Sequence, residues 1–106
     1  MSEEWTRRVT DPDGRDVVFD AGSHLHLAQG LRANLLDHLD TILGAIERPD
    51  YRHDDPLPGR ERFYRDNFPV PGTPGTWLRV VVDFNDEPAW VVTGLVEEND
   101  PRSRQR

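Results

Sequence analysis

The stretch WLRVVVDFNDEPAWVVTGLV, residues 77–96, decides the fold. It contains two runs rich in β-branched and aromatic side chains, Trp77–Phe84 and Ala89–Val96, and such runs are typical of β-strands. The polar segment Asn85–Pro88 between them predicts a tight hairpin turn. We therefore expect two neighbouring antiparallel strands in the C-terminal third of the chain.

Side-chain alternation assigns residues of these and neighbouring strands to two faces of a sheet, because successive side chains on a strand point in opposite directions. The bulky set is expected to pack on a helix and comprises Phe63, Leu78, Val80, Val82, Phe84, Trp90, Val92 and Val96. The opposite face is expected to collect Arg60, Arg62, Tyr64, Arg79 and Thr93. This second set predicts a local positive surface that can form hydrogen bonds.

Working toward the N-terminus, the pattern predicts two further strands, residues 50–54 and 60–68, around a turn-rich loop. Before them, apolar residues recur at spacings of three and four and form the stripe of an amphipathic helix, or of two helices broken near Gly30. This stripe runs from Leu27 to Ile46, and Pro49 ends it. The residues Asp20, Ala21, Gly22 and Ser23 mark a break before the helix and supply a possible N-cap.

At the N-terminal end, the segment WTRRVTDPDGRDVVF, residues 5–19, predicts a hairpin that turns at Asp11–Gly14. The expected fold is therefore α+β, with an N-terminal hairpin and an amphipathic helix or helices packed on an antiparallel sheet of about four strands. We expect residues 1–98 to form a single domain and residues 99–106 to form a flexible tail.

Composition excludes several classes of function. The chain has no cysteine, and all thirteen basic residues are arginine, so thiolate and Schiff-base chemistry are excluded. No nucleotide-binding loop or cofactor motif is present, and no cofactor is expected. No run approaches the length of a membrane span or a signal peptide, so we expect a cytoplasmic protein without membrane contact. The net charge of −7 requires any nucleic-acid site to be a local basic patch.

The stretch GSHLHLAQG, residues 22–30, presents two histidines at the start of the predicted helix. If the segment were a strand, His24 and His26 would face the same way and could share a metal ion. On a helix they diverge by about 200°, which disfavours a shared metal. Two interpretations remain. One of the histidines acts as a general acid/base, because histidine titrates near neutrality, or both are structural residues. A metal site would take its third ligand from residues 53–55.

The arginines of the predicted polar face also have two readings. Guanidinium groups bind phosphate through paired hydrogen bonds, so Arg60, Arg62 and Arg79 are candidate anion ligands. Alternatively, they form ordinary surface ion pairs with neighbouring carboxylates, namely Glu61, Asp66 or Asp83.

The order of these pieces resembles the phage and polymorphic-toxin nuclease-like domains of the barnase, EndoU, colicin and RelE type. The resemblance covers roughly residues 17–98. Its fragments are the helix ending IERPDYRHDD, followed by GRERFYRD, WLRVVVDF and WVVTGLVE. The family fold, helices followed by a curved antiparallel sheet, agrees with the architecture expected from the sequence pattern.

The resemblance implies a toxin-like endoribonuclease that needs no metal. In that reaction a base accepts the ribose 2′-OH proton, cations stabilise the phosphorane, and an acid protonates the departing 5′ oxygen. Carried over to this chain, it implies His26, or else His24, as the acid/base. It further implies Arg60 and Arg62 on the scissile phosphate, and Tyr64 and Thr93 as positioning groups. RNA and an antitoxin or immunity protein are the implied partners.

Two features depart from the family pattern. A second histidine that many relatives carry falls near Gly30 and Leu31 here and is missing, and RelE-like toxins are usually basic. A second hypothesis is therefore a catalytically inactive module of the same fold that uses its acidic surface to bind a basic protein. Neither hypothesis predicts the RNA target or the oligomeric state.

Overall fold

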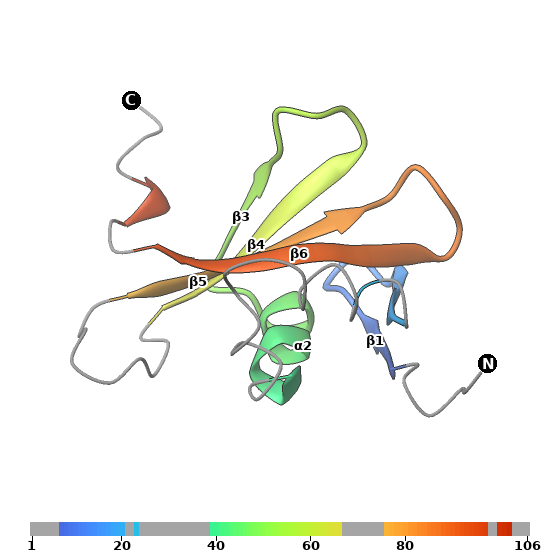
Figure 1. Cartoon of the computed structure of the whole chain (residues 1–106), viewed down its shortest axis with the longest axis horizontal. Helices are drawn as coiled ribbons and strands as arrows, with labels where there is room; N and C mark the ends of the chain where they lie inside the picture. The colour runs from blue at the N-terminus through green and yellow to red at the C-terminus, as the bar shows by residue number, and fades with distance from the viewer. Residues whose placement is uncertain (1–6, 21–22, 24–38, 67–75, 98–99, 103–106) are drawn as a thin grey trace.

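The computed structural model describes residues 7–20, 23, 39–66, 76–97 and 100–102, and it contains one helix packed on a six-stranded sheet (Figure 1). The elements are β1 (Arg7–Thr10), β2 (Asp16–Phe19), α2 (Leu39–Glu47), β3 (Tyr51–Asp54), β4 (Arg60–Asp66), β5 (Trp77–Asp83) and β6 (Ala89–Glu97). The α+β class and the positions of all six strands agree with the sequence prediction. The earlier part of the predicted helix lies outside the described residues.

The sheet is larger than predicted, and it is mixed rather than antiparallel. Its strand order is β1-β2-β6-β5-β4-β3. The N-terminal hairpin forms as expected, but it joins the sheet because β2 runs parallel to β6, where Val17 pairs with Ala89 and Val18 with Trp90. The sheet therefore has six strands instead of about four. Local patterning misses this join because it connects segments far apart in the sequence.

The hydrophobic core lies between α2 and one face of the sheet, here called the helix face. From α2, the buried side chains are Ile42, Leu43, Ala45 and Ile46. They cluster with Phe63, Leu78, Val80, Val82 and Val91 of the central strands and with Val17 and Phe19 of β2. The opposite surface, here called the outer face, carries the predicted set Arg60, Arg62, Tyr64, Arg79 and Thr93.

A β-bulge in β6 corrects the predicted faces of the last strand. Val81 pairs with Thr93 but Val82 pairs with Val91, so Val92 is an extra residue in the ladder. Val91 therefore faces the core and Thr93 faces outward, although simple alternation had placed them together. The same shift puts Trp90 on the outer face, opposite Asp83. Strict period-two counting cannot anticipate a bulge.

Two contacts fix the position of Ser23 after the end of β2. The Asp20 carboxylate accepts a hydrogen bond from the Ser23 backbone N–H at 3.0 Å, the contact that an N-cap residue makes. The Ser23 hydroxyl, which is buried, donates to the Val91 carbonyl at 2.6 Å. The predicted capping segment is thus fastened to the central part of the sheet.

Part of the segment expected to be a free tail belongs to the folded unit. Pro101 is buried, and the guanidinium of Arg102 lies 5.1 Å from the centre of the Trp77 ring. Asp100 accepts hydrogen bonds from the backbone and side chain of Arg102. Residues 100–102 therefore pack against the sheet near the end of β6.

A matched pair of leucines tests the assignment of the core. Leu78 is fully buried on the helix face, whereas Leu57 in the β3–β4 loop is 54% exposed. We expect Leu78→Ala to lower the free energy of unfolding by about 2–5 kcal/mol and Leu57→Ala to change it by less than about 0.5 kcal/mol. Urea unfolding followed by circular dichroism measures both. Equal effects of the two substitutions would show that the helix face is misassigned.

Candidate functional site on the outer face

The strand register brings the five predicted residues of the outer face onto one surface. Directly paired residues share a face, so the pairs Arg62–Val81 and Val81–Thr93 form one row across three strands. Adjacent strands lie about 4.8 Å apart, which puts the backbones at Arg62 and Thr93 about 10 Å from each other. The next row along the strands contains Tyr64 and Arg79. The side chains of Arg62 and Thr93 are close enough to contact one extended ligand together.

Arg62 is held in place by a carboxylate from the loop before its strand. Its Nε donates to Asp55 Oδ1 at 2.8 Å, and both side chains are largely buried. Burial alone would raise the pKa of Asp55, but hydrogen bonds from Arg62 and from the Leu57 backbone N–H outweigh it and lower the pKa. The ion pair engages one of the five N–H donors of the guanidinium and fixes the direction of the others.

The other two arginines of the face also have carboxylate partners. Arg60 Nε lies 3.4 Å from Asp83 Oδ2, and Arg79 Nη1 lies 2.7 Å from Glu97 Oε2. The pKa of Asp83 is lowered mainly by the backbone N–H of Asn85, with Arg60 adding to the effect. Arg60, Arg62 and Arg79 are thus each matched by one acid, and these three pairs carry no net charge.

This charge balance corrects two expectations from the sequence. The outer face was predicted to be positive, yet its three arginines are neutralised. Of the predicted acidic neighbours Asp83 is a partner, whereas Glu61 points to the helix face and binds Arg15 and Arg52 there. The partners Asp55 and Glu97 were missed because they depend on a loop path and on strand pairing across the sheet.

Tyr64 has mainly a packing role in the structure. Its side chain is almost fully buried. The ring packs 5.6 Å from Tyr51 and edge-on to Trp77 at 6.4 Å, measured between ring centres. Although burial opposes it, hydrogen bonds with Asp55 and with the Tyr64 hydroxyl raise the pKa of Arg62. Tyr64 is therefore placed to orient Arg62, which agrees with a positioning role but not with direct proton transfer.

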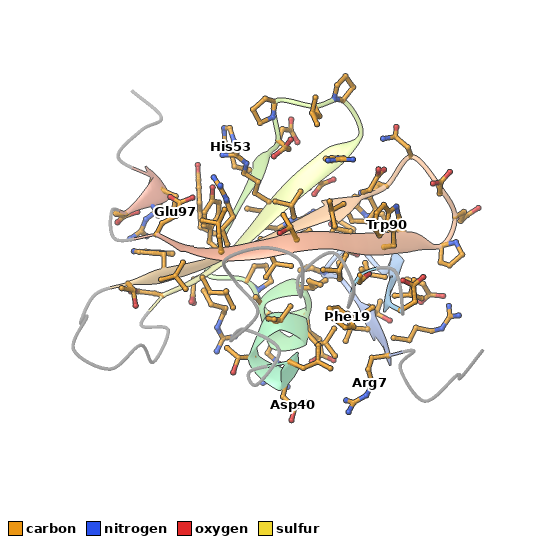
Figure 2. The ribbon with its side chains drawn as sticks, viewed as in Figure 1. Arg7, Phe19, Asp40, His53, Trp90 and Glu97 are labelled. Carbon is orange, nitrogen blue, oxygen red and sulfur yellow. The ribbon has the colours of Figure 1, made fainter. Side chains whose placement is uncertain are left out.

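The register also places a histidine at this face that the sequence indicated only as a metal-ligand candidate. His53 pairs directly with Arg62, so the two side chains are neighbours on the outer face. Figure 2 shows His53 on the side of the sheet away from α2. The signal that could have found it is the period-two alternation of β3, combined with a turn at residues 55–59 that sets its pairing with β4.

The helix-entrance histidines, His24 and His26, lie outside the described residues. Their assignment as acid/base therefore stays a prediction, as does the role of Thr93 as a positioning group. Within the described ranges, no three His, Asp or Glu side chains gather as a metal ion would require. No helix in the same ranges combines the length and apolar content needed to cross a bilayer.

A second charged cluster lies on the helix face, where the β1–β2 turn meets β4. Arg15 forms ion pairs with Asp11 of its own turn at 2.7 Å and with Glu61 at 2.9 Å. Its guanidinium also lies 3.7 Å from the centre of the Phe84 ring. Arg52 joins the cluster by pairing with Glu61 and Asp13. The cluster connects the N-terminal hairpin to the strands at the other side of the sheet.

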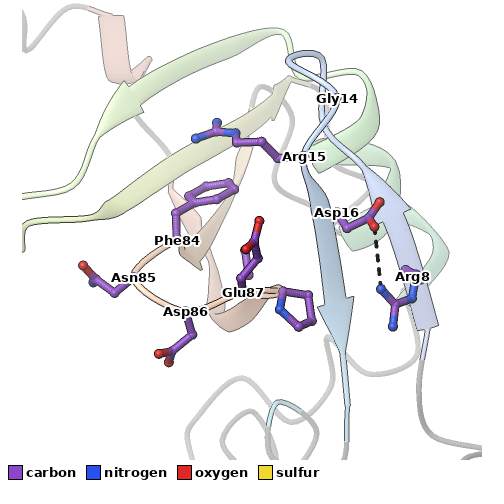
Figure 3. Close-up of a pocket in the computed structure, with 10 residues that line it drawn as sticks. Arg8, Gly14, Arg15, Asp16, Phe84, Asn85, Asp86 and Glu87 are labelled. Atoms are coloured by element: carbon purple, nitrogen blue, oxygen red, sulfur yellow. Dashed lines mark ion pairs between the residues drawn. The ribbon is translucent and has the colours of Figure 1, made fainter.

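A hollow borders this cluster rather than the outer face. It is a groove of about 780 Å³ between the β1–β2 turn and the β5–β6 turn, and Arg15 and Phe84 form part of its wall (Figure 3). It lies beside the start of the β2–β6 pairing, where Val17 pairs with Ala89. Arg8 and Asp16, also in its lining, pair at 3.8 Å. Among the described residues, none of those predicted for catalysis lines this groove.

Comparison of the chain with family models, with curated proteins and with solved structures gives no match.

The helix-face cluster predicts a specific pH dependence of stability. Burial alone would raise the pKa of Glu61, but hydrogen bonds from Arg15 and Arg52 outweigh it and lower the pKa below the ordinary value of 4.5. A lowered pKa stabilises the fold above 4.5, and this contribution is lost as the pH falls through the folded-state value. We expect Glu61→Gln to lower the free energy of unfolding by roughly 1–3 kcal/mol at neutral pH, with a difference from wild type that shrinks in acid.

Urea unfolding between neutral pH and about pH 3 measures this difference, with the exposed Glu87→Gln in the β5–β6 turn as control. The control should follow wild type at every pH. A Glu61→Gln effect that is the same at all pH values would show that the carboxylate is not ionised within the cluster.

Proposed function

We propose that the chain is a metal-independent endoribonuclease of the RelE and barnase type whose substrate binds on the outer face of the sheet. The observation that carries the proposal is the anchoring of Arg60 and Arg62. In both residues the carboxylate contact is made through Nε. This geometry orients the guanidinium and leaves its Nη groups outside the ion pair, as a phosphate clamp requires.

The remaining residues of the face fit the same chemistry. Thr93 lies in the same row as Arg62, where its hydroxyl can contact a ribose or phosphate oxygen. The Tyr64 hydroxyl forms a hydrogen bond with Arg62 and helps to orient it. Because α2 packs on the opposite face of the sheet, it leaves the strands free to present these side chains to a substrate. A role as the toxin of a toxin–antitoxin or immunity pair is part of the same proposal.

The charge balance of the face favours a second candidate. With each of the three arginines paired to an acid and a net charge of −7, long-range attraction to RNA is weak. A module of the same fold that binds a basic protein through its acidic surface is consistent with that balance. The two candidates differ in one readout, because only the nuclease cleaves RNA.

The test is cleavage of a labelled single-stranded RNA by the purified full chain at neutral pH in EDTA. We expect wild type to cleave and Arg62→Ala to lower kcat/KM about 100-fold or more, because a donor that stabilises transition-state charge is removed. Arg7→Ala is the matched control. Arg7 is an exposed arginine of β1 that pairs with Asp40, and its loss should leave the rate unchanged.

Salt dependence provides a second measurement. Two phosphate contacts on single-stranded RNA predict that log K for binding falls with log salt with a slope of roughly −1.4.

Intact RNA after incubation with folded wild type, together with normal growth of cells that express it, would reject the nuclease and favour the protein-binding module.

A further inference from the structure

His53 has the position that a proton-transfer group on the outer face requires. It is exposed and is the one histidine among the described residues. It pairs directly with Arg62, so the two Cβ atoms are about 5 Å apart. A phosphate held by Arg62 would therefore lie within reach of the imidazole. The sequence resemblance assigned this role to the helix entrance instead.

The contacts of the ring determine which nitrogen can exchange a proton with substrate. Nδ1 lies 2.7 Å from the Asp54 carbonyl oxygen. A carbonyl oxygen only accepts hydrogen bonds, so Nδ1 carries the proton in the neutral ring, and Nε2 carries the lone pair. The ring also stacks on Tyr51, with 6.3 Å between ring centres and 24° between planes. These contacts orient the imidazole as a general base.

The charged and titratable groups around His53 are Arg62 from β4 and Tyr51 and Asp54 from its own strand. Asp55 binds Arg62, and so the guanidinium beside the imidazole is balanced by a carboxylate.

We propose that His53 is the general base of the outer face, and this inference rests on the proposed nuclease function. Nε2 of His53 accepts the ribose 2′-OH proton while the O2′–P bond forms. The P–O5′ bond breaks, its electron pair stays on O5′, and water protonates O5′. The resulting hydroxide then takes the proton from the imidazolium, which restores the neutral ring. The products are a 2′,3′-cyclic phosphate and a 5′-hydroxyl.

The experiment compares His53→Ala with His26→Ala and His24→Ala in the full chain, using the same RNA-cleavage assay. We expect His53→Ala to lower kcat about 100-fold or more with little change in KM, because general-base catalysis contributes to the chemical step. Added imidazole should restore a part of the lost rate that grows with its concentration. The exposed position of His53 predicts that circular dichroism and thermal unfolding stay as in wild type.

Each outcome decides between the claims. Loss in His53→Ala with imidazole rescue supports the inference, whether or not His26→Ala is also impaired. If wild type and His53→Ala cleave equally well, the inference is overturned while the nuclease function stands. Loss that imidazole cannot restore, or a change confined to KM, overturns proton transfer by His53. Failure of wild type to cleave RNA rejects the nuclease function and this inference with it.

Discussion

Arg15 provides the interaction on which the shape of the sheet depends. The N-terminal hairpin joins β6 through only two residue pairs. The backbone hydrogen bonds between β2 and β6 therefore hold the hairpin weakly on their own. Arg15 adds ion pairs to Asp11 and Glu61 and lies on the Phe84 ring, which ties the turn of the hairpin to β4. Because β4 lies three strands from β2 in the sheet order, this contact joins elements from opposite sides of the sheet on the helix face.

The two faces of the sheet use ion pairs for different purposes. On the helix face, Glu61 bridges Arg15 and Arg52 and joins separate elements. On the outer face, each of the three predicted anion-binding arginines has an acid that orients it within its own part of the sheet. These partly buried pairs fix the direction of the guanidinium groups on the outer face. The same pairing limits attraction of RNA from a distance.

Much of the fold could be predicted from the sequence, because most of it depends on local patterns. Alternation correctly placed Leu78, Val80 and Val82 on the helix face of the sheet and Arg62 on the outer face. It failed at Val92, where a bulge reverses the phase of β6. The candidate site was harder to predict. Its arginines were found by alternation, whereas Asp55 and Glu97 depend on a loop path and on strand pairing that local patterns do not give. His53 could have been placed from the alternation of β3 and the short turn that sets its register with β4.

The parallel join of β2 to β6 has a consequence for how the chain folds. α2 and the strands β3 to β6 are arranged as near neighbours in the sequence, whereas Val17 must meet Ala89 across most of the chain. Closing such a long loop costs chain entropy before any contact repays it. The helix and the β3–β6 meander are therefore expected to assemble first, with the hairpin docking late, and a phi value near zero at Val17 would record that order. In that order of assembly, the groove beside Arg15 lies at the boundary where the N-terminal hairpin docks on the strands that formed before it.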